Sequence, residues 1–128
     1  MTEANGTLPI AVGWGPALDR QVLVDLQEAL EDSSGEFLRN LADVYRRQAA
    51  ALVADMRDAA RSGDLGGLSR AAHSLKGSSA NVGGTRLAAM CAELERWDGA
   101  GPGLDTKIST IQGEVERLQR EMVEFLSA

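Results

Sequence analysis

The chain has 128 residues, of which 44% are hydrophobic and 25% charged, so it suits one soluble domain with a single core. Its formal net charge of −6 argues against nonspecific binding to nucleic acid or to an anionic membrane. The single cysteine, Cys91, excludes a disulfide within the chain, and no apolar run reaches the ~20 residues of a membrane span. We therefore expect a cytoplasmic protein with Cys91 in its core.

Aromatic residues make up only 4% of the chain while Ala and Leu are abundant, which favours helices over strands. Residues 1–15 hold several glycines and show no long periodicity. We expect a flexible leader or linker there and a folded domain over residues 16–128. The first predicted helix covers residues 16–31, because Pro16 suits a first helical turn. An apolar residue then recurs every four positions, at Leu18, Val22, Leu26 and Leu30.

Two longer helices follow, each bounded by residues that start or stop helices. The second predicted helix covers residues 36–62, between an Asp-Ser-Ser-Gly break and Gly63. Its expected apolar face consists of Phe37, Leu41, Val44, Tyr45, Leu52, Met56 and Ala59. Asp64 is a suitable N-cap for the third predicted helix, residues 65–81. The expected apolar stripe of that helix is Leu65, Leu68, Ala72, Leu75, Ser79 and Val82.

The last two predicted helices flank the glycine-rich loop of residues 98–103. The fourth covers residues 85–97, and its expected inward-facing residues are Leu87, Met90, Cys91 and Leu94. The fifth runs from residue 104 to the chain end, with a heptad stripe of Leu104, Ile108, Ile111, Val115, Leu118, Met122 and Phe125. That stripe is either the core of a bundle in a monomer, which we favour, or a coiled-coil seam between chains. The pattern predicts an all-α, up-and-down helical bundle with short loops.

His73, the only histidine, lies at the edge of the apolar stripe of the third helix and faces outward. Its neighbours on the helix surface are Ser69, Arg70, Lys76, Gly77 and Ala80. A lone histidine beside an apolar stripe is often structural. Here a cation three residues on and a glycine four residues on favour a functional role, although the spacing alone does not name a reaction.

Gly77 and Lys76 are the neighbours that carry this interpretation. A glycine inside a helix costs about 1 kcal/mol relative to alanine, and on an exposed face no core packing explains it. Removing the side chain at this position would let another protein approach the imidazole. The Lys76 ammonium would offset the negative charge of a phosphoryl group on His73.

The stretch from Ala72 to Gly83, with its sequence AHSLKGSSANVG, resembles the signature of histidine-containing phosphotransfer (HPt) domains. Gly63-Asp64 before it, and Leu87, Cys91, Leu94 and Glu95 after it, are also similar to that family. The resemblance covers residues 16–128 and is sharp over residues 63–95. It implies a four-helix, up-and-down antiparallel bundle with an additional N-terminal capping helix.

The resemblance also implies roles for individual residues. His73 would accept the phosphoryl group on the ring nitrogen furthest from the backbone, Lys76 would stabilise it, and Gly77 would give the partner access. Glu95 would orient the imidazole, the alternative being an ordinary solvated helical residue. A partner would dock on small residues and part of the first or second helix, with candidate contacts at Ser69, Arg70, Ser74 and Ala80. Arg70 and Lys76 would give the docking face a local positive charge.

The implied function is a phosphorelay carrier between the phospho-aspartate of one receiver domain and the aspartate of another. The chain has no glycine-rich nucleotide loop, so we expect no ATP site, no autokinase activity and no cofactor or metal of its own. The receiver would supply Mg²⁺. The expected partners are response-regulator receivers and a hybrid sensor histidine kinase.

Three other functions stay open at this point. The dimerisation domain of a histidine kinase is disfavoured, because Ser74 follows the histidine and no proline follows before Pro102. The phosphotransfer module of a chemotaxis-type kinase, which takes its phosphoryl group from an ATP-binding domain, is barely separable by local sequence. A receiver-binding adaptor that transfers nothing is the third, and the presence of His73, Lys76 and Gly77 argues against it.

Overall fold

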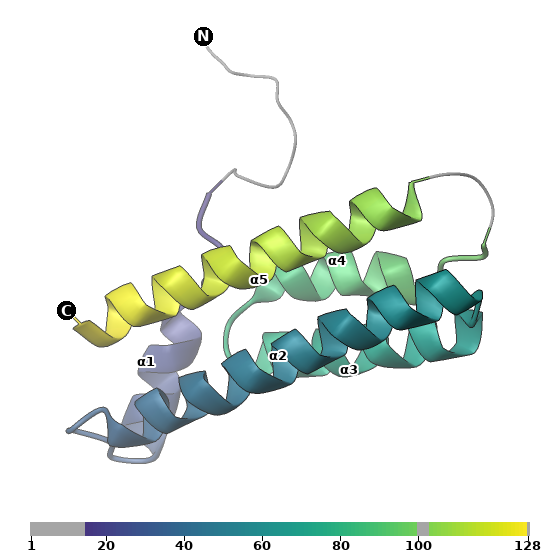
Figure 1. Ribbon diagram of the computed structural model, residues 1–128. Coiled ribbons are helices and arrows are strands. Elements are labelled where there is room, and N and C mark those ends of the chain that lie inside the picture. The colour runs from purple at the N-terminus through teal and green to yellow at the C-terminus, as the bar shows by residue number, and fades with distance from the viewer. Residues whose placement is uncertain (1–14, 100–102, 128) are drawn as a thin grey trace, which may run out of the picture.

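The computed structural model describes residues 15–99 and 103–127 and contains no strand within those ranges. Within these described ranges, five α-helices follow one another (Figure 1). Their bounds are α1 Arg20–Ala29, α2 Glu36–Ser62, α3 Leu65–Asn81, α4 Thr85–Glu95 and α5 Leu104–Ser127. The predicted leader lies outside the described residues except for Gly15.

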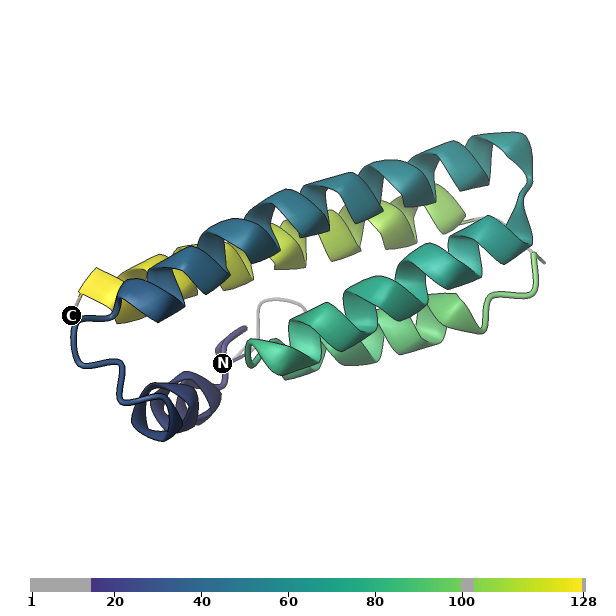
Figure 2. The same ribbon diagram turned by 90° about the horizontal axis from the view of Figure 1, so that it is seen from below.

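The helices α2 to α5 form an up-and-down antiparallel bundle, which confirms the predicted fold class. α3 packs against α2 and α4, and α5 packs against the same two helices. α2 and α5 have 27 and 24 residues, whereas α3 and α4 have 17 and 11. At about 1.5 Å per residue, α2 and α5 therefore extend beyond the shorter pair. α1 crosses the bundle at that protruding end and is seen almost end-on in Figure 2.

The core is mostly apolar and is formed by residues of all five helices. The heptad stripe of α5 is buried there from Ile108 to Met122, so the prediction of a bundle core is confirmed over that stretch. Cys91 is also fully buried, as predicted, and burial raises the pKa of its thiol to about 12. One polar pair joins α2 to α3 inside the core, where the hydroxyls of Tyr45 and Ser79 lie 2.8 Å apart. Among the described residues, no helix combines the length and apolarity needed to cross a bilayer.

The predicted apolar face of α2 is partly wrong. Phe37 and Val44 are exposed by 45% and 52%, whereas the buried residues of this helix are Leu38, Tyr45, Ala49, Val53, Met56 and Ala59. α2 carries two apolar stripes, and the one that continues along the whole helix faces the core. The stripe containing Phe37 and Val44 covers only the first half of α2 and lies on the surface. Leu30 and Leu65, also predicted to lie inward, are exposed near helix ends.

The first helix begins four residues later than predicted, at Arg20. The Asp19 side chain accepts a hydrogen bond from the Gln21 amide and caps the helix there. The preceding residues, Ala17 and Leu18, are buried without being helical. The Leu18 amide donates to Glu121 at 2.9 Å, so the chain is tied to α5 before α1 begins.

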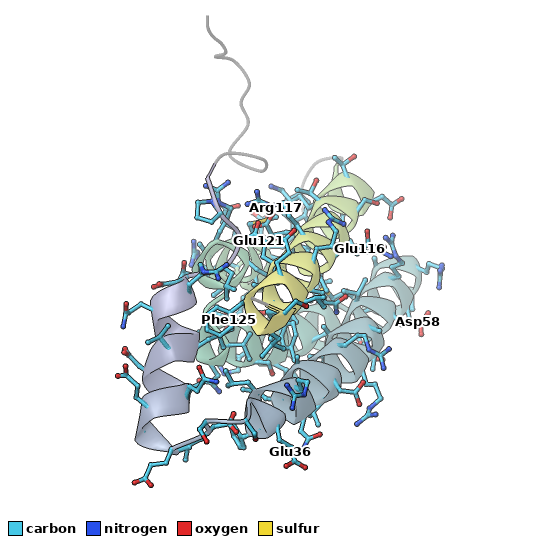
Figure 3. All side chains as sticks on the ribbon, turned by 90° about the vertical axis from the view of Figure 1, so that its left-hand side faces the viewer. Glu36, Asp58, Glu116, Arg117, Glu121 and Phe125 are labelled. Carbon is cyan, nitrogen blue, oxygen red and sulfur yellow. The ribbon has the colours of Figure 1, made fainter. Side chains whose placement is uncertain are left out.

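A charged cluster on α5 secures this entry into α1. Arg117 donates to the main-chain oxygen of Gly15 at 2.8 Å and pairs with the fully buried Glu114 at 3.2 Å. Arg117 and Glu121 lie on the side of α5 where the chain enters α1 (Figure 3). The burial of Glu114 was not predicted, because the heptad pattern was drawn from apolar residues only.

Candidate functional site

The outward position of His73 follows from the way α3 is anchored. Asp64 caps the helix by accepting a hydrogen bond from the Gly67 amide at 2.9 Å. Leu68, Ala72 and Leu75 are buried and fix the rotation of the helix against the core. His73 then points away from the core, and its side chain is 67% exposed. The sequence therefore predicted both the bounds of α3 and the exposure of this histidine.

Glu95, at the end of α4, contacts two of the other predicted site residues, His73 and Lys76. One carboxylate oxygen, Oε2, lies 2.8 Å from Nδ1 of His73. The other, Oε1, accepts a hydrogen bond from Nζ of Lys76 at 2.6 Å. The side chains of Lys76 and Glu95 are 35% and 25% exposed, so both contacts are partly shielded from water. Glu95 is thus in direct contact with the imidazole, and is more than a solvated helical residue.

The charge on Glu95 decides which imidazole nitrogen carries the proton. The hydrogen bond from Lys76 is the largest cause that holds the pKa of Glu95 below its ordinary value, and the hydrogen bond with His73 is the next. The carboxylate is therefore ionised at neutral pH and only accepts hydrogen bonds. Nδ1 of His73 must then be the donor. In the neutral ring this leaves a lone pair on Nε2, the nitrogen furthest from the backbone.

Ser69, predicted as a docking residue on the surface, points toward α4 in the structure. It is half-buried, and its hydroxyl donates to the main-chain oxygen of Glu95 at 3.2 Å. α4 was predicted to run to Trp97 but ends at Glu95, because the amides of Arg96 and Trp97 turn back to carbonyls one helical turn earlier. This early end leaves the Glu95 carbonyl free of its own helix and available to Ser69.

Gly77 lies on the exposed face next to His73 and has no packing reason to be glycine. A Cβ built on it would meet nothing within 4 Å. Gly84 is the opposite case, because a Cβ there would lie 2.6 Å from Cδ2 of Leu118 and 3.2 Å from the Ser79 carbonyl oxygen. The surface beside His73 is therefore open at Gly77, as the sequence predicted.

The other predicted docking residues, Arg70, Ser74 and Ala80, are all exposed. Arg70 and Ala80 lie on the same side of α3 as His73, whereas Ser74 follows His73 directly and points about 100° away from it. The Ser78 hydroxyl donates to Gln48 of α2 at 3.1 Å, so the exposed surface of α3 continues onto α2. On α2 this surface includes the exposed apolar residues Phe37 and Val44. Both residues were predicted to lie in the core, so their place on this surface was not expected from the sequence.

The predicted local positive charge around His73 is wrong in its simple form. Glu95 neutralises Lys76, and Arg70 shares a groove between α2 and α3 with three carboxylates, those of Asp55, Asp58 and Asp64. The surface therefore presents both signs of charge. Within the described ranges, no group of three or more His, Cys, Asp or Glu residues is arranged to hold a metal ion.

Comparison with known proteins identifies the family of this chain. The Hpt domain family matches residues 40–121, more than half of the chain. Multistep phosphorelay regulator 1 of Schizosaccharomyces pombe (strain 972 / ATCC 24843) is 34% identical over 80 residues, which cover 62% of this chain and 27% of the regulator. The chain thus matches about a quarter of the length of that protein.

A solved structure extends the similarity to the fold. The crystal structure of histidine-containing phosphotransfer protein B (HptB) from Pseudomonas aeruginosa PAO1 is 29% identical, with a TM-score of 0.58. The alignment covers 88% of this chain and 90% of HptB. The chain belongs to the Hpt domain family. By their names, the two similar proteins are a phosphorelay regulator and a histidine-containing phosphotransfer protein.

Proposed function

We propose that His73 accepts a phosphoryl group from the phospho-aspartate of one receiver domain and passes it to the aspartate of another. One observation carries this proposal. Glu95 binds Nδ1 of His73 at 2.8 Å, and the His73 side chain is 67% exposed. The lone pair on Nε2 is therefore accessible to a partner. A neutral imidazole with a free lone pair is a nucleophile at neutral pH.

The transfer needs no proton movement at the attacking nitrogen. The Nε2 lone pair of His73 forms a bond to phosphorus as the bond from phosphorus to the aspartate oxygen breaks, and the receiver's carboxylate leaves with the electron pair. The imidazole becomes positively charged because Nδ1 keeps its proton. Glu95 offsets that charge through the hydrogen bond it already makes, as a carboxylate does for the histidine of a catalytic triad. The reverse sequence delivers the group to the second receiver.

Lys76 and Gly77 have separate roles in this proposal. Lys76 lies one helical turn from His73, within reach of a phosphoryl group on Nε2. Its ammonium would turn from Oε1 of Glu95 to the phosphoryl oxygens and offset their added charge. Gly77 leaves the space through which the receiver's aspartate approaches.

The docking surface proposed for the receiver runs from His73 and Gly77 across Gln48 to the exposed stripe of α2. Phe37 and Val44 supply apolar area on that stripe, and the Gln48–Ser78 hydrogen bond makes the surface continuous with α3. Relay contacts must form and separate quickly, which suits an interface near the small end of the size range. The receiver is the source of Mg²⁺ and of the acidic pocket. A hybrid sensor kinase in the cytoplasm is the proposed origin of the phosphoryl group.

A labelling experiment separates this function from the two remaining alternatives. Wild-type protein is incubated separately with a receiver carrying labelled phospho-aspartate, with labelled ATP alone, and with labelled ATP plus the ATP-binding domain of a chemotaxis-type kinase. We expect acid-labile label on the protein from the receiver and none from ATP. Label from ATP alone would contradict a carrier without kinase activity. If label arrived only from the ATP-binding domain of a chemotaxis-type kinase, the kinase-module function would replace this one. Absence of label from every donor would leave an adaptor.

A further inference from the structure

Ser69 lies on α3 one helical turn before His73, on the side that faces α4. Its hydroxyl donates to the main-chain oxygen of Glu95 at 3.2 Å, and the contact is partly buried. Ser69 was predicted to lie on the docking surface, whereas in the structure its hydroxyl points toward the neighbouring helix. Ser69 therefore contacts the residue that binds the imidazole without contacting the imidazole itself.

The Glu95 carbonyl is one of the last in α4, and such carbonyls lack partners within their own helix. The Arg96 amide bonds to the carbonyls of Glu93 and Leu94, and the Trp97 amide bonds to Leu94 at 3.0 Å. Ser69 supplies the hydrogen bond for the Glu95 carbonyl from across the helix interface. This bond fixes the backbone from which the Glu95 carboxylate projects.

α3 thus holds Glu95 at three different atoms. His73 binds Oε2 and Lys76 binds Oε1, while Ser69 binds the main-chain oxygen. In the proposed reaction the first two contacts change, because His73 gains a phosphoryl group and Lys76 turns toward it. The Ser69 contact involves no reacting group, so it persists through the transfer.

We propose that Ser69 is a positioning residue for phosphotransfer. By holding the Glu95 backbone, it keeps the carboxylate on Nδ1 of His73 and the lone pair on the outward nitrogen. This inference rests on the proposed function for its effect on transfer. Its effect on the imidazole is a property of the unphosphorylated protein.

The test compares Ser69→Ala with Ser109→Ala, a matched change at an exposed serine inside α5. The ¹⁵N shifts of the His73 ring, read at about pH 8 where an imidazole is neutral, report which nitrogen carries the proton. We expect the Nδ1–H form in wild type and Ser109→Ala, and a growing share of the Nε2–H form in Ser69→Ala. Ser69→Thr, which keeps the hydroxyl, should restore the wild-type ring signals.

Transfer from a phosphorylated receiver gives the second readout. Ser69→Ala should slow it roughly 2- to 10-fold, the size expected for one lost hydrogen bond. Ring signals identical to wild type in Ser69→Ala would overturn the inference. Slower transfer with unchanged ring signals would also overturn it, since Ser69 would then act on the partner directly. The ring signals are measured on the unphosphorylated protein, so they test the role of Ser69 even if the protein transfers no phosphoryl group. A failure of the proposed function would instead appear as absence of transfer in the wild-type protein.

Discussion

Gly77 and Gly113 are both glycines inside helices on the surface, and a Cβ on either would meet nothing within 4 Å. They differ in place, because Gly77 lies beside His73 on α3 and Gly113 lies on α5. Replacing either by glutamine should stabilise its helix by about 0.5–1 kcal/mol, since glutamine is the better helix former. A difference between the two variants in phosphotransfer therefore reports on position alone.

We expect Gly77→Gln to slow transfer from a phosphorylated receiver by about 10- to 100-fold, because the new side chain holds the reacting atoms apart. Gly113→Gln should transfer at the wild-type rate. Thermal unfolding of both variants checks that neither has lost its fold. Equal transfer rates in the two variants would remove the proposed access role of Gly77.

At the same scale, the sequence predicted the site residues better than their contacts. The positions of His73, Lys76 and Gly77 on one helix follow from periodicity, because all three lie on α3. Glu95 and Ser69 depend on how α4 packs against α3 and on where α4 ends, and neither is encoded locally. Ser69 was predicted to contact the partner because a helical wheel gives the direction of a side chain. It does not show whether a neighbouring helix, here α4, covers that side chain.

Among the elements, α2 shows most clearly where sequence reasoning fails. Its bounds were predicted correctly, because Gly35 and Gly63 delimit it. Its buried face was not, because two apolar stripes compete and the packing of α3 and α5 selects between them. The stripe left on the surface is the one that we propose as the receiver's docking site.

Two exposed valines test that docking role. Val44 on α2 is 52% exposed and Val123 on α5 is 60% exposed, so aspartate at either position should change stability by only about 0.5 kcal/mol. We expect Val44→Asp to raise the receiver concentration needed for half-maximal transfer about tenfold, since it places a charge in an apolar contact. Val123→Asp should behave as wild type. If both variants matched wild type, docking would have to use another face.

For the whole molecule, the fold was predictable because its helices are separated by clear breaks and carry 3.6-residue periodicity. The attachment of the N-terminal segment was not predictable. It depends on Glu114, Arg117 and Glu121, whose positions on α5 read as ordinary surface charges. α1 and its anchor close the end of the bundle beyond α3 and α4. The residues that we propose for phosphotransfer lie along the side of the bundle, where His73 is exposed.

The central claim is that His73 is the phosphoacceptor, and its direct test is transfer to His73→Gln. Glutamine retains a polar side chain at this exposed helical position, so the fold should be unchanged, which circular dichroism checks. Wild-type protein mixed with a phosphorylated receiver should gain acid-labile, base-stable label, as expected for phosphate on nitrogen. His73→Gln should gain none. Equal labelling of the two proteins would contradict the account.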